Sequence, residues 1–342
     1  MSKWLVRFIG AVLPIVFVMV PLVSYGGTPT FPKMEIKVGY TMNTETPEHQ
    51  GALRLAELLK ERTGGAVTLQ TGPNSLFGND NDLLQLVKTG VIQAHICGGP
   101  VLSSLGGYEP LGVFYTPFMF KGDKEEQHYN AIVKVMSGPV GKEIIEKGTK
   151  DSGTRLMDTW WYGIRQTSTK SKPITKPDDL KGMKIRASDQ PIQKMTMVAL
   201  GATTTPTAMP EVYMALQMGV VDGQQNVVNT IYAFKFFEVQ KYVSMLGDMT
   251  MPLVFTINEK FYQSLSPELR DILDRSVKEA GQYQAKLQIE MNNKDLESLK
   301  AKGMIVNYVN RAEFAERTKD AWKTFESTFG KGLHERAMQA LQ

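Results

Sequence analysis

The stretch IKVGYTMNTETPEHQGALRLAELLKERTGGAVTLQ, residues 36–70, contains the pattern that decides the fold class. Its first part, Ile36–Tyr40, predicts a short strand. Thr46 followed by Pro47 predicts a helix start, with proline at the first helical position. Leucine and alanine at helical spacing follow until a Gly-Gly pair ends the helix. Val67–Gln70 then predicts a second strand, so this stretch is a strand–helix–strand unit.

The same alternation continues along the rest of the chain. Further helices are expected at 80–88, 125–147 (broken at Gly138-Pro139 and ended by Gly148), 191–200, 211–218 and 267–302, with two more at the end of the chain. Further strands are expected at 91–96, 154–158, 163–168, 183–187, 203–205, 220–222, 252–258 and 304–309. Strands that alternate with helices predict an α/β architecture with mainly parallel sheets.

The N-terminus has the three regions of a secretory signal peptide. Lys3 and Arg7 form a basic start, residues 8–23 form an apolar run, and small residues follow. The run is shorter than the roughly 20 residues that a membrane-spanning helix needs. We therefore expect residues 1–26 to be cleaved as a signal peptide and the mature chain to be exported. An uncleaved membrane anchor is the alternative.

Composition and charge exclude several classes of function. The 342 residues are 42% hydrophobic and 22% charged, which is typical of a folded globular protein large enough for two domains. The net charge of +4 falls to +2 once Lys3 and Arg7 are removed with the signal peptide. Because the sequence has no run of Lys and Arg and no basic stripe interleaved with aromatic residues, nucleic-acid binding is not expected.

The sequence lacks the short motifs of catalysis and metal binding. Its four histidines form no HExxH motif, and there is no CxxC, GxSxG, GxGxxG or Walker-A sequence. The single cysteine, Cys97, lies in an apolar stretch and is expected to be a buried small residue rather than a nucleophile. These absences favour binding over catalysis, and no metal or cofactor is expected.

The segment 160–226 contains the main candidate binding residues. In LKGMKIR, residues 180–186, Arg186 ends an alternating apolar pattern and so lies at the carboxyl end of a strand, where ligands bind in open α/β sheets. Its guanidinium is a planar, two-pronged donor that matches a carboxylate. The alternative is a surface arginine paired with Asp178 or Asp179.

Other residues of this segment have similar positions. Asn226 follows an expected strand, and its amide both donates and accepts hydrogen bonds, although it is equally suited to cap the next helix. Arg165 lies in a third short strand. Trp160 and Trp161 are adjacent, so on a strand they face opposite sides, and we expect one in the core and one in a cleft.

The segment resembles the extracytoplasmic solute-binding proteins of tripartite ATP-independent periplasmic (TRAP) transporters, the DctP family. The resemblance rests on LKGMKIR, on PEVYMALQMGVVDGQQN at 210–226 and on the GxR element at 163–165. Upstream, ERTGGAVTLQ, SLFGNDNDLLQLVKTG and LGVFYTPFMF are also similar to family segments. Together these segments extend the resemblance over nearly the whole mature chain.

The resemblance implies a particular fold. This is an α/β, two-lobed periplasmic-binding-protein-like fold of the class II type, with a ligand cleft between the lobes and a long connecting helix. The expected division is 1–26 for the signal peptide, 27–162 with about 251–290 for lobe I, and 163–250 with about 291–342 for lobe II.

The resemblance also implies the roles of residues in the cleft. Arg186 matches the arginine that forms a bidentate salt bridge to the substrate carboxylate, and Asn226 matches the asparagine that contacts the same group. Asp80 matches an acidic position that contacts polar groups of the ligand. The other residues expected to contact substrate are Arg165, Ser188, Met209, Trp161 and Tyr213, the last two through apolar contacts.

We therefore expect a periplasmic protein, not an enzyme, that captures a small organic carboxylate. It delivers this ligand to the integral membrane subunits of a TRAP transporter, which use an ion gradient for uptake. Two alternatives remain: an exported enzyme that acts on a small acid with Asp80 or Glu211 as general base, and an exported ligand sensor.

Overall fold

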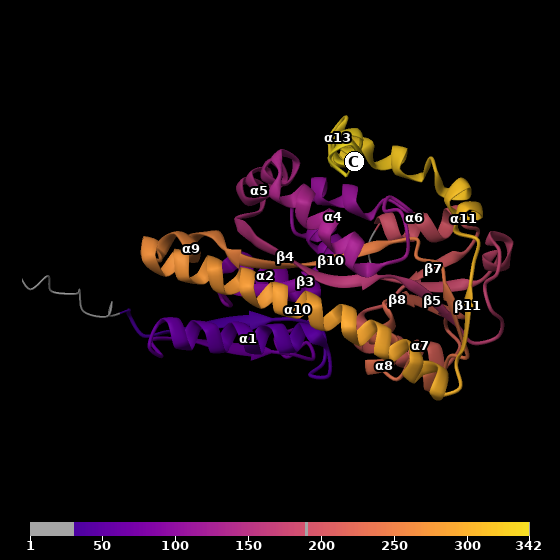
Figure 1. Cartoon of the computed structure of the whole chain (residues 1–342), viewed down its shortest axis with the longest axis horizontal. Coiled ribbons are helices and arrows are strands. Elements are labelled where there is room, and N and C mark those ends of the chain that lie inside the picture. The colour runs from indigo at the N-terminus through magenta and orange to yellow at the C-terminus, as the bar shows by residue number, and fades with distance from the viewer. Residues whose placement is uncertain (1–30, 189–190, 342) are drawn as a thin grey trace, which may run out of the picture. The chain divides into compact units, whose positions relative to one another are not determined.

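Two mixed β-sheets organise residues 31–188 and 191–341, the part of the chain that the structure, a computed structural model, describes (Figure 1). The expected signal peptide, residues 1–26, lies outside these residues. Sheet A has the strand order β2 (Val67–Gly72), β1 (Met34–Gly39), β3 (Ala94–Gly98), β10 (Thr250–Asn258) and β4 (Thr154–Ile164). Sheet B has the order β11 (Ile305–Tyr308), β9 (Tyr242–Met245), β5 (Gln166–Thr169), β8 (Gly223–Asn226), β6 (Lys184–Ala187) and β7 (Thr203–Pro206).

The expectation of mainly parallel sheets is only partly correct. Strand β10 runs antiparallel to β3 and β4, and β5 runs antiparallel to β8 and β9. The other pairs of strands are parallel. Both exceptions are strands that the chain enters directly from the other sheet, without the helical crossover that joins parallel neighbours.

Helices surround both sheets. They are α1 (Pro47–Arg62), α2 (Asp80–Thr89), α3 (Gly99–Leu105), α4 (Glu125–Ser137), α5 (Pro139–Ser152), α6 (Pro191–Ala199), α7 (Val212–Gln217), α8 (Val228–Ala233), α9 (Glu259–Ser264), α10 (Pro267–Ala301), α11 (Arg311–Thr318), α12 (Glu326–Phe329) and α13 (Leu333–Ala340). Shorter 3-10 helices are η1 (Glu109–Tyr115), η2 (Pro177–Leu180), η3 (Met209–Glu211), η4 (Phe236–Glu238) and η5 (Ala321–Phe325).

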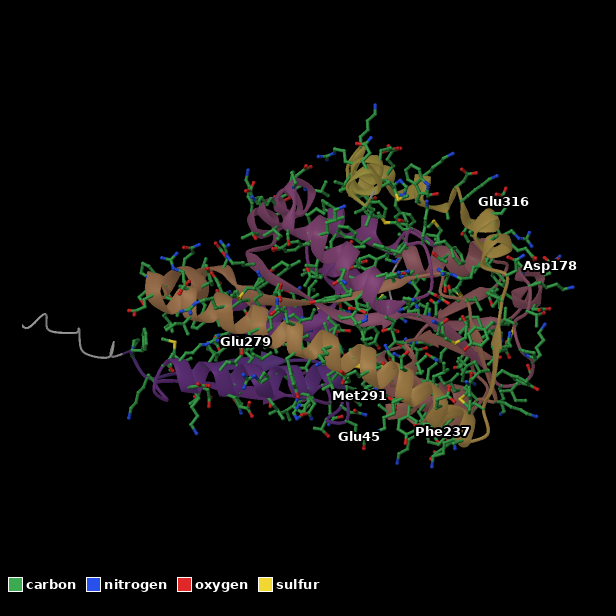
Figure 2. The ribbon with its side chains drawn as sticks, in the orientation of Figure 1. Glu45, Asp178, Phe237, Glu279, Met291 and Glu316 are labelled. Carbon is green, nitrogen blue, oxygen red and sulfur yellow. The ribbon has the colours of Figure 1, made fainter. Side chains whose placement is uncertain are left out.

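The long helix α10 connects the two sheets. Its 35 residues pack against α1 and β4 on the side of sheet A and against α8 on the side of sheet B (Figure 1). Figure 2 labels Glu279 on α10. This residue accepts a hydrogen bond from Arg54 of α1 (3.0 Å) and also forms an ion pair with Arg62. The expected long connecting helix is therefore present.

Helix ends follow the expected signals in most places. Helix α1 starts at Pro47 with Thr46 at the N-cap, and Gly90, in a left-handed conformation (φ 79°), caps α2. Gly148 does not end α5, which continues to Ser152. A Cβ at Gly148 would lie 2.1 Å from the ring of Tyr108, so this glycine allows close packing instead of a helix end.

Two strand predictions are wrong in position, and the strands concerned, β5 and β8, consist of buried polar residues and glycine instead of apolar ones. The strand expected at 220–222 is instead β8, whose residues Gly223–Asn226 are all buried. The strand expected at 163–168 is divided, with β4 ending at Ile164 and β5 beginning at Gln166. Arg165 lies in the gap and its backbone N–H donates to the carbonyl of Met249 (2.9 Å), which lies on the other connection between the sheets.

Strand β4 contributes the largest side chains of the core. Trp160 and Trp161 are both fully buried. The Trp160 ring lies 5.7 Å from that of Phe255, and its Nε1 donates to the carbonyl of Val277 in α10 (3.3 Å). Helix α10 approaches this ring closely because Gly281 has no side chain; a Cβ there would lie 2.4 Å from ring atoms of Trp160.

We predict that Gly281→Ala destabilises the protein, although alanine is the better helix former by about 1 kcal/mol. Overpacking against Trp160 is expected to cost about 1–3 kcal/mol and to lower the melting temperature measured by circular dichroism. Gln282→Ala, on the exposed side of the same helix, is the matched control and should change stability by less than about 0.5 kcal/mol. A raised melting temperature for Gly281→Ala would contradict this packing.

A hydrogen-bond network links α4, β4, α10 and α8. Trp161 Nε1 donates to Glu125 Oε2 (2.9 Å), and Asn292 Nδ2 donates to both carboxylate oxygens of Glu125 (2.9 and 2.8 Å). Asn292 Oδ1 accepts the backbone N–H of Asn229 (2.8 Å), which extends the network to sheet B. Burial raises the pKa of Glu125 to about 7, despite these three hydrogen bonds.

This raised pKa predicts a pH dependence of stability. Since the folded state holds the proton up to about pH 7 and the unfolded state releases it near pH 4.5, stability falls as pH rises between these values. The free energy of unfolding of Glu125→Gln, measured in urea, is therefore expected to exceed that of the wild type by up to about 1–3 kcal/mol as the pH rises from 5 to 8. Glu126→Gln, on the exposed face of α4, is the control. An equal pH dependence in the wild type and Glu125→Gln would contradict the prediction.

Candidate ligand-binding site

A cavity lies where residues of both sheets meet. It has a volume of about 60 Å³ and adjoins a wider cavity of about 230 Å³ that shares Arg186, Asp80 and Met209 with it. Strands β6 and β8 supply Arg186 and Asn226 from sheet B, and α1, α2 and β3 supply Glu48, Asp80 and apolar residues from the side of sheet A. Further lining residues come from β4, β10, α3, η3 and the connecting segments. The residues around the smaller cavity are Thr41, Met42, Glu48, Asp80, Ile96, Cys97, Gly98, Pro100, Val101, Tyr162, Arg165, Arg186, Ser188, Met209, Asn226, Met251 and Leu253.

Arg186 is held in a fixed orientation at the carboxyl end of β6. Its Nε and Nη2 both donate to the backbone carbonyl of Thr207 (3.0 and 2.7 Å), and only 4% of the residue is exposed. The third nitrogen of the guanidinium, Nη1, takes no part in this contact with Thr207. Burial, and after it the nearby charge of Arg165, lower the pKa of Arg186 to about 10, so the group remains positively charged at neutral pH.

Arg165 lies beside it, in the connection between β4 and β5. Its Nη1 donates to the backbone carbonyl of Gln225 and to Oδ1 of Asn226 (3.4 Å). Its Nε has no hydrogen-bond partner among the described residues, although the side chain is buried. Burial lowers the pKa of Arg165. Two buried guanidinium groups therefore face one small cavity, and this arrangement favours binding of an anion.

Asn226 is oriented by its neighbours as well. Its Oδ1 accepts from the hydroxyl of Tyr162 (3.0 Å), and its Nδ2 donates to Oε1 of Gln224 (2.8 Å). Helix α8 has Val227 at its N-cap without a side-chain cap, so the alternative role of Asn226 as a helix cap is excluded.

The acidic side chains of the cavity come from the side of sheet A. Glu48, in the first turn of α1, is 2% exposed and its Oε2 has no hydrogen-bond partner in the described part of the chain. Burial, with a smaller contribution from Asp80, raises the pKa of Glu48 well above its usual value. Asp80, at the start of α2, has Oδ1 3.4 Å from Nε2 of the buried His95.

Six of the eight residues expected to contact a ligand line this cavity. They are Arg186, Arg165, Asn226, Asp80, Ser188 and Met209. Trp161 does not line it, because its indole points to Glu125 and packs against Tyr129 of α4. Tyr213 does not line it either, since it lies half-buried on α7, where its hydroxyl donates to Glu238 (2.7 Å). The ligand contacts themselves remain a prediction for all eight residues.

The surface alternative for Arg186 is wrong. Asp178 instead pairs with Arg317 of α11, and Asp179 accepts from the hydroxyl and backbone N–H of Thr175 (2.6 and 2.8 Å). Figure 2 shows Asp178 close to the position of Glu316, the neighbour of Arg317, at the outer end of sheet B.

Sequence reasoning missed three polar groups around the cavity: Thr41, Glu48 and the carbonyl of Thr207. A signal for the first two was present, because both follow β1 at its carboxyl end, where ligands bind in open sheets. The carbonyl of Thr207 is a backbone group, and nothing in its side chain marks it. Cys97, expected in the core, is buried at the edge of the cavity, and burial raises the pKa of its thiol.

Metal and membrane features are not found in the described residues. No group of three or more His, Cys, Asp or Glu side chains is arranged to hold a metal ion in residues 31–188 and 191–341. None of the helices in that part of the chain combines the length and apolar character that a membrane crossing requires.

The two sheets with a polar cavity between them define the class of periplasmic-binding-protein-like folds. The profile described as bacterial extracellular solute-binding protein, family 7 (DctP), matches residues 38–328. The chain therefore belongs to the DctP family of solute-binding proteins of TRAP transporters, and the expected two-lobed fold is confirmed.

Relatives of established type support this assignment. The chain is 30% identical over 291 residues to the 2,3-diketo-L-gulonate-binding periplasmic protein YiaO of Escherichia coli, covering 84% of this chain and 86% of that protein. It is 31% identical over 273 residues to the C4-dicarboxylate-binding periplasmic protein DctP of Rhodobacter capsulatus, covering 78% of each.

Solved structures show the same fold. The sugar acid binding protein of Advenella mimigardefordensis in complex with galactonate matches with a TM-score of 0.84 and 25% identity, over 91% of this chain and 98% of that one. A TRAP periplasmic solute-binding protein of Sulfurospirillum deleyianum with bound succinate matches with a TM-score of 0.82 and 27% identity, over 91% of this chain and all of the other.

Proposed function

We propose that the mature chain captures a small organic carboxylate in this cavity and delivers it, in the periplasm, to the membrane subunits of a TRAP transporter. The observation that carries the proposal is the pair of buried guanidinium groups of Arg165 and Arg186 at one small cavity. A carboxylate there accepts hydrogen bonds from the Nη1 side of Arg186 and from Asn226.

The fixed orientation of Arg186 is the main source of affinity. Because the carbonyl of Thr207 already holds Nε and Nη2, little side-chain entropy is lost when a ligand binds. Burial also strengthens the attraction between the guanidinium and a carboxylate, since the surrounding dielectric is low. Two like charges at one site are unfavourable until an anion neutralises them. A micromolar dissociation constant requires about −8 kcal/mol, which such an anchor and its hydrogen bonds supply together.

Closure of two lobes around the ligand follows from the connections between the sheets. We propose that lobe I is built on sheet A and lobe II on sheet B, with the expected boundaries near 162, 250 and 290. The contacts of α12 with η1, and of α13 with η1, α4 and α5, favour lobe I for the end of the chain. The hinge then includes Arg165 and Met249, which are joined by a backbone hydrogen bond, and α10.

The similarity to relatives supports an acidic ligand. The names of those relatives describe binding of 2,3-diketo-L-gulonate, C4-dicarboxylates, galactonate and succinate, all of which carry at least one carboxylate. The membrane partners and the cleaved signal peptide are part of the proposal for this chain.

Catalysis is the less favoured alternative. Glu211, one of the two candidate bases, is exposed on η3 and does not line the cavity. We propose that the bound acid is released unchanged, and mass spectrometry of the ligand recovered after incubation checks this directly. A chemically altered product would favour the exported enzyme.

A ligand sensor would bind the same acid but would not restore uptake when combined with TRAP membrane subunits.

We predict that Arg186→Ala reduces affinity for the cognate acid at least 100-fold in isothermal titration calorimetry, because a buried charge pair with a carboxylate is lost. Arg186→Lys is expected to lose at least tenfold, since a point charge does not reproduce the two-pronged geometry.

Arg317→Ala is the matched control for these variants. Arg317 lies on α11, outside the cavity, and pairs with Asp178. The affinity of this variant for the ligand should therefore stay within about twofold of the wild-type value. Unchanged affinity in Arg186→Ala, with the fold intact by circular dichroism, would remove Arg186 from its role as anchor.

A further inference from the structure

The end of β4, where the chain leaves sheet A for sheet B, is held by side chains outside the cavity. Glu125, the first residue of α4, accepts hydrogen bonds from Nε1 of Trp161 (2.9 Å) and from Nδ2 of Asn292 in α10 (2.9 and 2.8 Å). The backbone N–H of Ile164, the last residue of β4, donates to the same carboxylate. These four residues do not line either of the cavities described above.

Asn292 joins this carboxylate to the side of sheet B. Its Oδ1 accepts the backbone N–H of Asn229 in α8 (2.8 Å). Asn292 is buried and follows Met291, which Figure 2 labels on α10. It lies near the boundary proposed above, where α10 passes from lobe I to lobe II. The contact between Glu125 and Asn292, here called the hinge contact, therefore joins one lobe to the other.

The hinge contact lies against the backbone of Gly163. A Cβ at this glycine would lie 2.8 Å from Nδ2 of Asn292 and 3.3 Å from Oε1 of Glu125. The glycine also has a φ of 133°, which residues with a side chain rarely adopt. Since the lobes rotate about this connection when they open, opening changes the surroundings of the hinge contact.

The carboxyl of Glu125 is the titratable group of the hinge contact. Burial raises its pKa to about 7, and only hydrogen bonds, from Asn292, Trp161 and the backbone of Ile164, oppose this effect. When α10 moves away from α4, more water reaches the carboxyl. Because burial is the largest cause of the raised pKa, the pKa then falls towards its ordinary value of 4.5.

The neighbouring titratable rings do not take over this role. The ring of Tyr129 on α4 lies 5.8 Å from that of Trp161, and burial raises the pKa of Tyr129 to about 12, so it stays neutral. The ring nitrogens of His128 face Thr250 (2.7 Å) and the backbone carbonyl of Lys121 (3.1 Å) instead of Glu125.

The charged side chains of the packed elements lie away from the contact or have other partners. Burial also raises the pKa of Asp158 to about 7, but its carboxylate lies beside Gly281, about three turns of α10 from the contact. Asp295 accepts from Asn229 (2.7 Å), and burial raises its pKa too. Helix α8 and strand β10 contain no charged residue. The exposed ones on α4 and α10 are Lys124, Glu126 and Lys294. Substitution of Glu125 leaves all of these groups in place.

Resting on the function proposed above, we propose that Glu125 and Asn292 are positioning residues that hold the lobes closed around the bound acid, and that loss of the Glu125 proton favours opening. The closed form holds this proton up to about pH 7, whereas the open form releases it near pH 4.5. The stabilisation of the closed form is therefore complete below about pH 4.5 and is lost as the pH rises through 7.

Binding of succinate and galactonate, the acids bound in two of the related structures, tests the pH dependence in the mature chain. For the acid that binds more tightly, the affinity is measured by isothermal titration calorimetry at about pH 5.5 and about pH 8. The loss of affinity at the higher pH is expected to be at least about threefold larger in the wild type than in Glu125→Gln, because glutamine stays neutral. Glu126→Gln, on the exposed face of α4, is the matched control and should keep the wild-type pH dependence.

The kinetics of Asn292→Ala test the contact itself. Release of the ligand requires opening, so the dissociation rate in stopped-flow measurements is expected to rise at least about fivefold, while the association rate stays within about twofold. Asn293→Ala, the exposed neighbour on α10, is the matched control and should keep both rates. Melting curves of the ligand-free variants check that they fold.

The possible outcomes separate this inference from the proposed function. A wild-type dissociation rate in Asn292→Ala, or a wild-type pH dependence in Glu125→Gln, would overturn the inference. The proposed function would still stand if Arg186→Ala abolished binding in the same measurements. Absence of binding for both acids at millimolar concentration would count against the proposed function and against the inference that rests on it.

Discussion

The fixed guanidinium of Arg186 is the interaction on which the rest of this binding protein depends. One backbone carbonyl, that of Thr207, holds two of its nitrogens, so the group is aligned before any ligand arrives. Arg165 is held through Nη1 alone, which donates to the carbonyl of Gln225. Buried charges are costly, and a fold that keeps two of them beside one cavity is organised around the anion that neutralises them.

The polar interior of sheet B follows from this requirement. Gln224, Gln225 and Asn226 are fully buried in β8, and each has a side-chain partner, which keeps the strand stable without apolar residues. Gln225 also donates to Asp248, whose pKa burial raises to about 6. The network therefore surrounds the guanidinium groups with oriented amides rather than with free carboxylates.

Local sequence patterns were sufficient for much of the fold and for part of the site. Caps and apolar spacing predicted α1, α2 and α10, and the strand-end rule predicted the positions of Arg186 and Asn226.

The position of β8 was missed because its buried residues are polar. Trp161 and Tyr213 do not line the cavity. For Trp161, alternation gives two faces of a strand but does not show which face meets a cavity, and both faces of β4 are buried near it. Glu48 was missed although it follows the carboxyl end of β1, because its place in a helix's first turn does not distinguish a buried acid from a solvated one.

The most direct test is a crystal structure of the mature protein with its cognate acid bound. The account predicts that a carboxylate oxygen of the ligand lies within hydrogen-bond distance, about 2.7–3.0 Å, of the Arg186 guanidinium on its Nη1 side. It further predicts that Nε and Nη2 keep their contact with Thr207. A ligand held elsewhere, with the Arg186 guanidinium facing solvent or still unpaired on that side, would contradict the account.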